Sequence, residues 1–300
     1  MIATIPELIA SQSPGVAAAA ESAAAAAEPA SGLLAVLLLA VIQGLAEFLP
    51  ISSSGHLVLG RAAMGVKEAG LALDVSLHVG TLAAVVYAYR KDVARLFGEV
   101  CRADFRMCAW LIVATIPIGV IGVGVKHLIE EAAQSPRFAA GGLLLTATFL
   151  LLGEWKRPRA EEDAGQVDLE GSAYWGHPRW IDAPLLGLAQ SIAILPGVSR
   201  SGTTISAAFL RGIPAVQAAR LSFLMSIPAV SGAAIVELPH VLEEGIAGLP
   251  AWMILAAIAT AALVGWAALR TLVLVLSKGA FRYFAAYCAL LGGLALLLLK

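Results

Sequence analysis

The chain has 300 residues, of which 59% are hydrophobic and 14% charged, and its mean hydropathy is +0.85. This composition excludes a soluble domain and is typical of an integral membrane protein. The formal net charge of −1 and the lack of a basic stripe in the sequence give no support for a nucleic-acid partner, so we expect none.

The first 31 residues differ in kind from the rest of the chain. An alanine-rich stretch over 17–27 is interrupted by Glu21, and no basic residue precedes it, which makes it a poor signal peptide. We therefore expect residues 1–31 to be a disordered, alanine-rich extension to which we assign no function. Residues 32–300 are expected to form a single membrane domain.

Six apolar stretches approach the length of about 20 residues that a helix needs to cross a bilayer. Four others are too short to cross, and they lie in two pairs, each around a polar block. Two short helices joined by an irregular polar tip form a re-entrant hairpin, which enters and leaves the membrane by one face. The expected full spans are 74–90, 107–125, 138–153, 215–236, 250–270 and 281–299. The expected short segments are 32–48, 54–64, 183–195 and 201–212.

The lysine and arginine residues predict how these segments are oriented. The loops 90–106, 154–182 and 270–282 hold twelve of them, whereas the loops on the opposite side hold five. The positive-inside rule places the twelve in the cytoplasm, so that the first hairpin opens outward and the second inward. Because three spans follow each hairpin, we expect an all-α membrane protein with six full spans. It would be built from two inverted repeats over about 32–153 and 183–300.

Two polar blocks of nearly the same sequence interrupt the two hairpins. The first begins with Gly-Leu-Ala-Glu (44–47) and ends with Ser-Ser-Ser-Gly-His (52–56). The second begins with Gly-Leu-Ala-Gln (187–190) and ends with Ser-Arg-Ser-Gly (199–202), and both contain Leu-Pro between these parts. Such breaks are tolerated in a membrane where they are buried in protein or line a water-filled cavity. The repetition predicts a functional site where the two halves meet.

Gln43 and Glu47 are the first candidate functional residues. Since they are four residues apart, they share one face of a helix, and their oxygen atoms suit a hard cation, Mg²⁺ or Ca²⁺. A carboxylate buried in a membrane is costly and therefore marks a functional site. A satisfied hydrogen bond between helices, or a group that carries a proton, explains the pair equally well, so these interpretations stay open.

The serine run that follows predicts the start of a helix that binds phosphate. Pro50 ends the first short helix because proline cannot continue its hydrogen bonds. Ser52, Ser53 and Ser54 then offer hydroxyl groups and N-caps to a helix that begins near Gly55. The unpaired N–H groups and the positive dipole end of such a helix favour a phosphate.

Histidines provide the candidates for acid–base chemistry. His56 lies one turn inside the helix that follows the serines, close in sequence to Glu47, and we expect it to act as general base or nucleophile. A structural hydrogen bond is the alternative. Asp74 and His78 lie four residues apart near the outer end of a span, and this spacing favours a structural hydrogen bond between them.

The second block repeats the first, with an arginine where the first has its central serine. Arg200 is costly in apolar surroundings and needs a partner. Its planar fork fits the oxygens of a phosphate at two points. Glu47 is the alternative partner, in a buried ion pair, and both contacts are compatible with one resting site. Ser199, Ser201 and Gly202 surround Arg200 and belong to the same candidate phosphate site.

Taken together, the two blocks resemble one protein family. The string from Gln43 to His56, followed by Pro196-Gly-Val-Ser-Arg-Ser-Gly202, resembles undecaprenyl-diphosphate phosphatases of the bacitracin-resistance type, and the resemblance covers about 32–300. It implies a multi-pass enzyme of the bacterial inner membrane that hydrolyses undecaprenyl diphosphate to undecaprenyl phosphate and inorganic phosphate. This reaction recycles the lipid carrier of cell-wall synthesis. With the orientation above, the active site opens outward.

The matching positions imply the residues of the site. Glu47, Ser53, His56 and Arg200 correspond to the catalytic residues, and Glu47 with Gln43 would hold a divalent cation on an isoprenyl diphosphate lipid. Because the first position of the acidic motif is Gln43 here, Glu47 is its one anionic ligand. The sequence leaves the nucleophile open between Ser53, His56 and an activated water, and it leaves open whether the chain forms a homodimer. The residues expected to bind the substrate are Ser52, Ser54, Gly55, Ser199, Arg200, Ser201 and Gly202.

The alternative function is a flippase or transporter of the lipid carrier. Inverted repeats with paired hairpins are typical of transporters, and a fold alone does not exclude this function. Transport needs no nucleophile, so the presence of Ser53 and His56 favours hydrolysis. The acid-phosphatase-like lipid phosphatases share a Ser-Gly-His element with residues 54–56, but Ser206 stands where that class has a histidine.

Overall fold

The computed structural model describes residues 32–65, 70–133, 135–158, 178–244, 249–277, 279 and 281–298. The expected extension over 1–31 lies outside these residues, as does the centre of the loop predicted over 154–182. Every regular element in the described part of the chain is a helix, which confirms the expected all-α class.

Six of the helices are long and apolar enough to cross a membrane. They match the six predicted spans, and all but the last are extended at one or both ends, since a helix continues past the apolar core until a turn residue or a cap ends it. These helices are α4 (Gly70–Ala88), α6 (Arg106–Ala133), α7 (Pro136–Lys156), α10 (Ala215–Glu244), α11 (Ala251–Ser277) and α12 (Phe281–Leu298).

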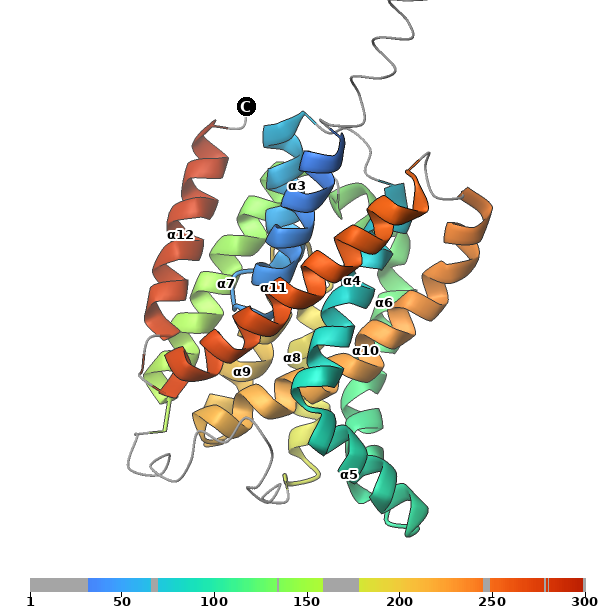
Figure 1. The fold of residues 1–300 in the computed structure, drawn as a ribbon. Coiled ribbons are helices and arrows are strands. Elements are labelled where there is room, and N and C mark those ends of the chain that lie inside the picture. The colour runs from blue at the N-terminus through green and yellow to red at the C-terminus, as the bar shows by residue number, and fades with distance from the viewer. Residues whose placement is uncertain are drawn as a thin grey trace, which may run out of the picture.

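The short helices form two pairs, as the four short segments predicted. Gly32–Phe48 is followed by α3 (Ser53–Met64), and α8 (Asp182–Ile192) is followed by α9 (Arg200–Leu210). In Figure 1 the first pair lies toward the end of the bundle that carries the C-terminus, and the second pair lies in the half that carries α5. The polar tips of the two pairs therefore approach each other in the interior of the bundle.

Two predictions about loops were wrong. The predicted loop 90–106 contains a helix, α5 (Arg90–Cys101), whose apolar residues recur with helical spacing but are diluted by charge. On α5, the buried Asp92 accepts from Arg220 of α10, with an Oδ2–Nε distance of 2.8 Å, so that a tertiary ion pair supports this helix. The predicted loop 237–249 is helical as far as Glu244, because Pro239 does not end α10.

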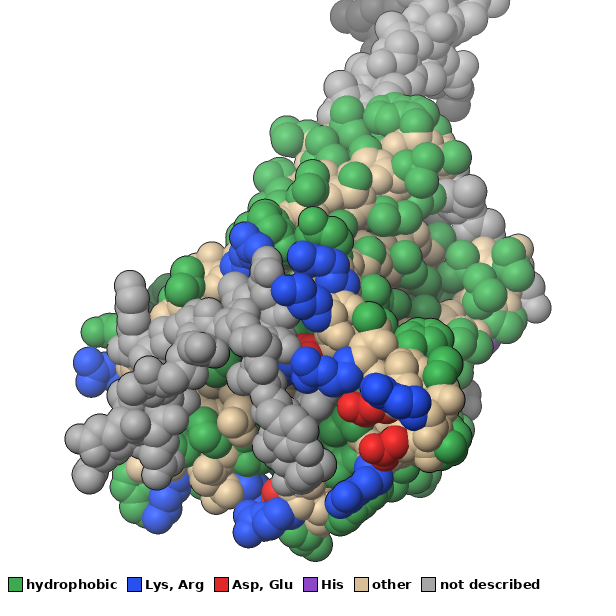
Figure 2. Space-filling view, turned by 60° about the horizontal axis from the view of Figure 1, so that its bottom comes forward, with side chains coloured by type: hydrophobic (Ala, Val, Ile, Leu, Met, Phe, Trp, Pro, Cys, Tyr) green, Lys and Arg blue, Asp and Glu red, His purple; other side chains and the backbone are tan. Residues whose placement is uncertain are grey.

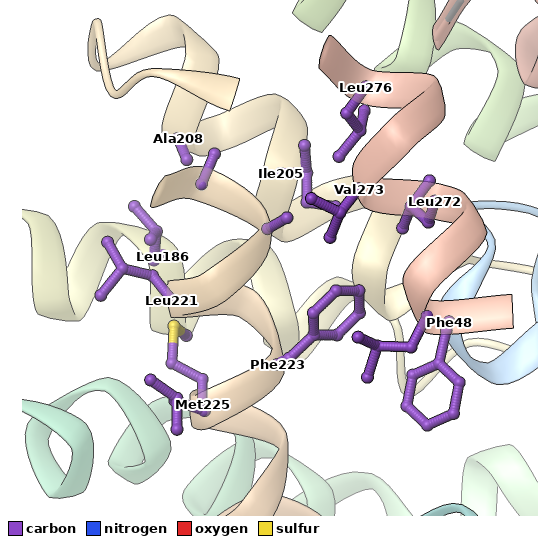
Figure 3. Packing of buried hydrophobic residues seen from close by; sticks show 14 of the residues in the cluster. Phe48, Leu186, Ile205, Ala208, Leu221, Phe223, Met225, Leu272, Val273 and Leu276 are labelled. Atoms are coloured by element: carbon purple, nitrogen blue, oxygen red, sulfur yellow. The ribbon is translucent and has the colours of Figure 1, made fainter. Parts of the chain in front are cut away.

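The core joins residues of both halves around the start of α10. Figure 3 shows Phe223 of α10 between the α9 and α11 side chains, next to Phe48. The rings of Phe48 and Phe223 meet edge to face with centroids 5.6 Å apart. Phe48 directly follows the acidic block, so this contact fixes the tip of the first hairpin against α10. Such buried aromatic pairs stabilise a fold beyond their area, by about 0.5–1.5 kcal/mol.

The tip of the second hairpin is pressed against α7. Gly197 has a φ of 85°, a left-handed conformation that glycine adopts without strain. A Cβ atom at Gly197 would collide with the backbone oxygen of Ala139, and a Cβ atom at Gly142 would collide with that of Pro196. The two glycines thus let the backbone of the tip touch α7 directly, which no larger residue would allow.

Lysine and arginine side chains gather at one end of the molecule. Figure 2 shows this end, which carries α5 in Figure 1, with blue basic groups around a few acidic ones. Asp182, at the start of α8, accepts there from Arg211 with an Oδ1–Nε distance of 2.7 Å and from Arg179 at 3.4 Å. Segments predicted to lie on one side of the membrane thus share one end of the bundle.

Candidate active site

Glu47 lies at the end of the first short helix and is the centre of the site. Its side chain is buried, and its Oε2 accepts from Gln43 Nε2 at 3.1 Å and from Ser53 Oγ at 2.7 Å. The predicted sharing of one helix face by Gln43 and Glu47 is confirmed by the first of these bonds. The second bond brings the serine of α3 to the carboxylate.

Arg200, the first residue of α9, connects the second tip to the first. Its Nη2 donates to Oε1 of Glu47, which forms the ion pair anticipated from the sequence as one alternative. Among the described residues, the buried Nη1 of Arg200 has no hydrogen-bond partner. Since Ser53 and Arg200 contact the same carboxylate, the prediction that the two motifs meet at one place is confirmed.

The two helix starts at the site are capped in the same way. Ser52 Oγ accepts from the N–H of Gly55 at 3.2 Å, and Ser199 Oγ accepts from the N–H of Gly202 at 3.1 Å. Each capping oxygen also lies 3.2 Å from the hydroxyl two residues on. Substituting such a cap by alanine typically costs about 1 kcal/mol. The repeated sequence therefore forms the same side-chain caps, although the backbone differs, with a φ of 72° at Ser52 and of −80° at Ser199.

Hydrogen bonds between the tips hold them in register. The N–H of Gly197 donates to Ser54 Oγ at 3.3 Å, and Ser201 Oγ donates to the carbonyl of Leu49 at 3.3 Å. From α7, Thr146 Oγ1 donates to the carbonyl of Gly197 and accepts from the N–H of Ser199, both at 2.9 Å. The serines predicted to bind substrate thus also fix the backbone around Arg200.

A cavity of about 350 Å³ opens beside these groups. Its polar lining contains the pair Glu47 and Arg200 together with hydroxyl groups and Asp74, His78 and Glu237, and apolar side chains of α4, α6 and α10 form the rest of the wall. The predicted site residues that line it are Glu47, Ser53, Ser54, Ser199 and Arg200. The apolar wall consists of Leu71, Val75, Ile118, Ala229, Val230, Ala233 and Ala234.

His56 is turned away from this cavity and toward α12. Its Nδ1 lies 2.8 Å from the carbonyl of Ser52, and since a carbonyl only accepts, Nδ1 donates. Its Nε2 lies 2.8 Å from the hydroxyl of Tyr287, whose ring stacks on the imidazole. Both ring nitrogens are therefore occupied, as the structural alternative anticipated, and the catalytic role of His56 stays a prediction.

The fold brings to the site three residues for which the sequence predicted no role there. Thr146 and Tyr287 lie in apolar spans, far along the chain from the polar blocks, and nothing in their surroundings marks them. His78 was paired with Asp74, and the hydrogen bond exists, but it runs from Nδ1 to the carbonyl of Asp74 at 2.8 Å. The carboxylate of Asp74 pairs instead with Arg61.

The donor set around Glu47 bears on the expected cation. In the described parts of the chain, no group of three or more His, Cys, Asp and Glu residues could hold a metal ion. The buried Oε1 of Gln43 has no hydrogen-bond partner among those residues, and it belongs to the same amide that donates to Glu47. One carboxylate and one unpaired amide oxygen are thus present.

These features define a class of protein: a multi-pass helical membrane protein whose buried polar site is formed by the tips of two broken helix pairs. The chain belongs to the family described as bacitracin resistance protein BacA, which matches residues 36–294. The resemblance stated from the two polar blocks is thereby confirmed.

The relatives of this chain carry one description. The undecaprenyl-diphosphatase of Desulfatibacillum aliphaticivorans is 39% identical over 282 residues, which cover 88% of this chain and 97% of the relative. That of Rubrobacter xylanophilus is 37% identical over 283 residues, with 89% and 99% covered. That of Methanosphaera stadtmanae is 33% identical over 285 residues, with 89% and 98% covered.

Proposed function

We propose that this chain is an undecaprenyl-diphosphatase that hydrolyses undecaprenyl diphosphate to undecaprenyl phosphate and inorganic phosphate. The observation that carries the proposal is the buried Nη1 of Arg200, a cationic donor without a partner among the described residues, in a side chain that lines the same cavity as Ser53. A buried donor of this kind is costly unless a ligand completes it. A phosphate oxygen is the ligand that its planar fork fits best.

The shape of the cavity supports an amphiphilic substrate. Its polar end, at Glu47 and Arg200, suits a diphosphate, and the apolar wall of α10 and α4 suits the first isoprene units. The starts of α3 and α9 point their N-terminal dipoles into this region, which favours anionic oxygens. A soluble phosphate ester would use the polar end alone.

We propose Ser53 as the nucleophile and Glu47 as its base, because the hydroxyl donates to Oε2 at 2.7 Å. Ser53 Oγ bonds to the terminal phosphorus, and its proton passes to Glu47. The bond from that phosphorus to the bridging oxygen breaks, and its electron pair leaves with undecaprenyl phosphate. Water then attacks the phosphorus of the phosphoserine and the bond from phosphorus to Ser53 Oγ breaks. Oγ recovers its proton from Glu47, and inorganic phosphate leaves with both protons of the water. Arg200 neutralises the oxygens as charge develops. Attack by His56 would require its ring to leave Tyr287.

We propose that Glu47 and Gln43 also hold the divalent cation, Mg²⁺ or Ca²⁺, expected for this site. The unpaired Oε1 of Gln43 and the adjacent carboxylate are oxygen donors of the kind such cations prefer, with phosphate and water as the further ligands. When bound, the cation supplies charge neutralisation to the diphosphate. Chelation should stop phosphate release and added Mg²⁺ or Ca²⁺ should restore it; full activity in excess chelator would remove the cation from the proposal.

We propose in addition that the two halves are inverted repeats and that the site opens to the outer face of the inner membrane. The matching caps at Ser52 and Ser199 support the repeat, and so do the positions of the two short-helix pairs in Figure 1. The basic end in Figure 2 supports the orientation, since positive loops favour the cytoplasm.

The deciding experiment measures phosphate released by purified protein in detergent from an isoprenyl diphosphate. Wild type should release one phosphate per lipid, and Ser53→Ala should be slower by about 10²-fold or more. The matched control is Ser76→Ala, whose hydroxyl only donates to the carbonyl of Ala72 in its own helix. Lipid movement across vesicles without phosphate release would favour the flippase instead.

A further inference from the structure

His78 on α4 reaches the centre of the site. Its Nε2 lies 3.9 Å from Oε2 of Glu47, the oxygen that also accepts from Ser53. The ring lines the same cavity as Arg200, and 39% of its side chain is exposed. It therefore faces open volume and is not enclosed in the core.

A hydrogen bond to the backbone of α4 fixes the orientation of the His78 imidazole. Nδ1 lies 2.8 Å from the carbonyl of Asp74, one turn earlier, and must donate to it because a carbonyl only accepts. The carboxylate of Asp74 is engaged by Arg61 and does not compete for the ring. The backbone of α4 thus holds the ring so that Nε2 points to Glu47.

Glu47 is flanked by two different nitrogen-bearing side chains. Arg200 contacts Oε1, and His78 approaches Oε2 on the side of Ser53. A phosphate placed for attack by Ser53 would lie between these groups, with its oxygens in reach of both. An anion in this position needs donors on more than one side, since its charge is otherwise uncompensated in a membrane interior.

We propose that His78 binds the diphosphate directly, with Nε2 forming a hydrogen bond to the terminal phosphate group on the side of the cavity away from Arg200. This inference rests on the proposed function. It adds a substrate-contacting residue from α4 to a site otherwise built from the two hairpin tips. A helix outside the hairpins would thereby help to hold the terminal phosphate in line with Ser53.

Two substitutions separate this role from a structural one. His78→Asn keeps a donor to the carbonyl of Asp74 but is too short to reach the phosphate. His78→Gln places an amide donor near the position of Nε2 but gives up the tie to Asp74. Direct binding predicts that the Gln variant works better than the Asn variant, whereas a structural role predicts the reverse order.

The measurement is the binding of inorganic diphosphate to full-length protein in detergent by calorimetry, alongside phosphate release from farnesyl diphosphate. We expect His78→Asn to weaken diphosphate binding by about 10- to 100-fold, the loss typical of one hydrogen bond to a charged group. His78→Gln should stay within about threefold of the wild type, because it retains a donor. The control is His240→Asn, at a histidine that pairs with Glu237 at 3.6 Å and is half exposed.

Wild-type affinity in a folded His78→Asn variant would overturn the proposal. If a melting-temperature measurement shows that the His78→Asn variant is not folded, the His78→Gln variant provides the test. Retained diphosphate binding in that variant supports the contact, and a loss of more than about tenfold refutes it. The calorimetry needs no turnover. A wild type that binds diphosphate but releases no phosphate from the lipid would therefore refute the proposed function while leaving the His78 contact tested.

Discussion

Glu47 combines several contacts in one carboxylate, because it accepts from Ser53 and pairs with Arg200. Glu47→Gln keeps the shape and removes the charge. We expect turnover to fall by about 10²-fold or more, since the serine loses its base, and a modest increase of Mg²⁺ or Ca²⁺ should not restore it. The measurement is phosphate release by Glu47→Gln, and the control is Glu99→Gln, at a residue of α5 that lies far along the chain from the site. Turnover within a few-fold of wild type would show that Glu47 is not the base.

Arg200 holds Glu47 through Nη2 and leaves Nη1 for a ligand. Arg200→Lys keeps the charge but loses the planar fork, so we expect turnover to fall by roughly 10- to 100-fold. Arg200→Ala should be slower still, because it leaves both Glu47 and the phosphate uncompensated in a buried site. Initial rates of the two variants at saturating isoprenyl diphosphate provide the test. Wild-type rates in both variants would mean that charge and geometry at this position are both dispensable.

His56 is the predicted catalytic residue that lies outside the cavity lining. If it is needed for chemistry, His56→Ala should insert and purify normally but lose at least about 10²-fold in turnover. Tyr287→Phe is the companion variant, since it releases Nε2 and leaves the bond from Nδ1 to Ser52 in place. Near-normal turnover of a well-folded His56→Ala protein would show that His56 has a structural role only. Glu47 would then be the group that accepts the proton.

The sequence reveals those site residues whose contacts are with residues close to them along the chain. Gln43 and Glu47 are one helical turn apart, and the caps at Ser52 and Ser199 are local, so periodicity and motif suffice for them. The contact of His56 with Tyr287 joins residues 231 positions apart. Such a contact is created by packing, and single-sequence patterns carry no trace of it.

At the scale of the helices, we expect α10 to contact the substrate tail. Its residues Ala229 to Ala234 form part of the apolar wall of the cavity. Ala233→Trp would fill this side, and we expect it to raise KM for farnesyl diphosphate about tenfold, by analogy with the cost of overpacking. Binding of inorganic diphosphate should be unchanged. The control is Ala267→Trp, an exposed alanine of α11 that does not line the cavity. Equal KM values for the two variants would place the tail elsewhere.

The helices were predicted correctly where the length of an apolar stretch is enough to identify them. All six spans were found because a bilayer demands about 20 apolar residues. The helix α5 was missed because its charged residues are typical of a loop, whereas the buried pair of Asp92 with Arg220 supports it in the fold. The end of α10 was placed too early, at 236, because the apolar stretch ends there, whereas the helix continues past Pro239 to Glu244. Proline is tolerated in membrane helices, where neighbouring groups take over the freed carbonyl.

At the scale of the whole molecule, the two polar tips form one site only because the hairpins come from opposite ends of the bundle (Figure 1). The bonds from Gly197 to Ser54 and from Ser201 to Leu49 join the halves at this point. Neither half contains both Glu47 and Arg200. The proposed reaction therefore needs both halves, and separating them would leave each with a buried charge that lacks its partner.

The orientation of this assembly can be tested with one engineered and one natural thiol. Leu242 is exposed near the end of α10, on the side predicted to be extracytoplasmic, and Cys101 is exposed at the end of α5, on the basic side. With Cys108 and Cys288 replaced, Leu242→Cys should react with an impermeant thiol reagent in intact cells, because positive loops are retained in the cytoplasm. Cys101 should react only after permeabilisation. Labelling of Cys101 but not of residue 242 in intact cells would reverse the orientation and turn the site toward the cytoplasm.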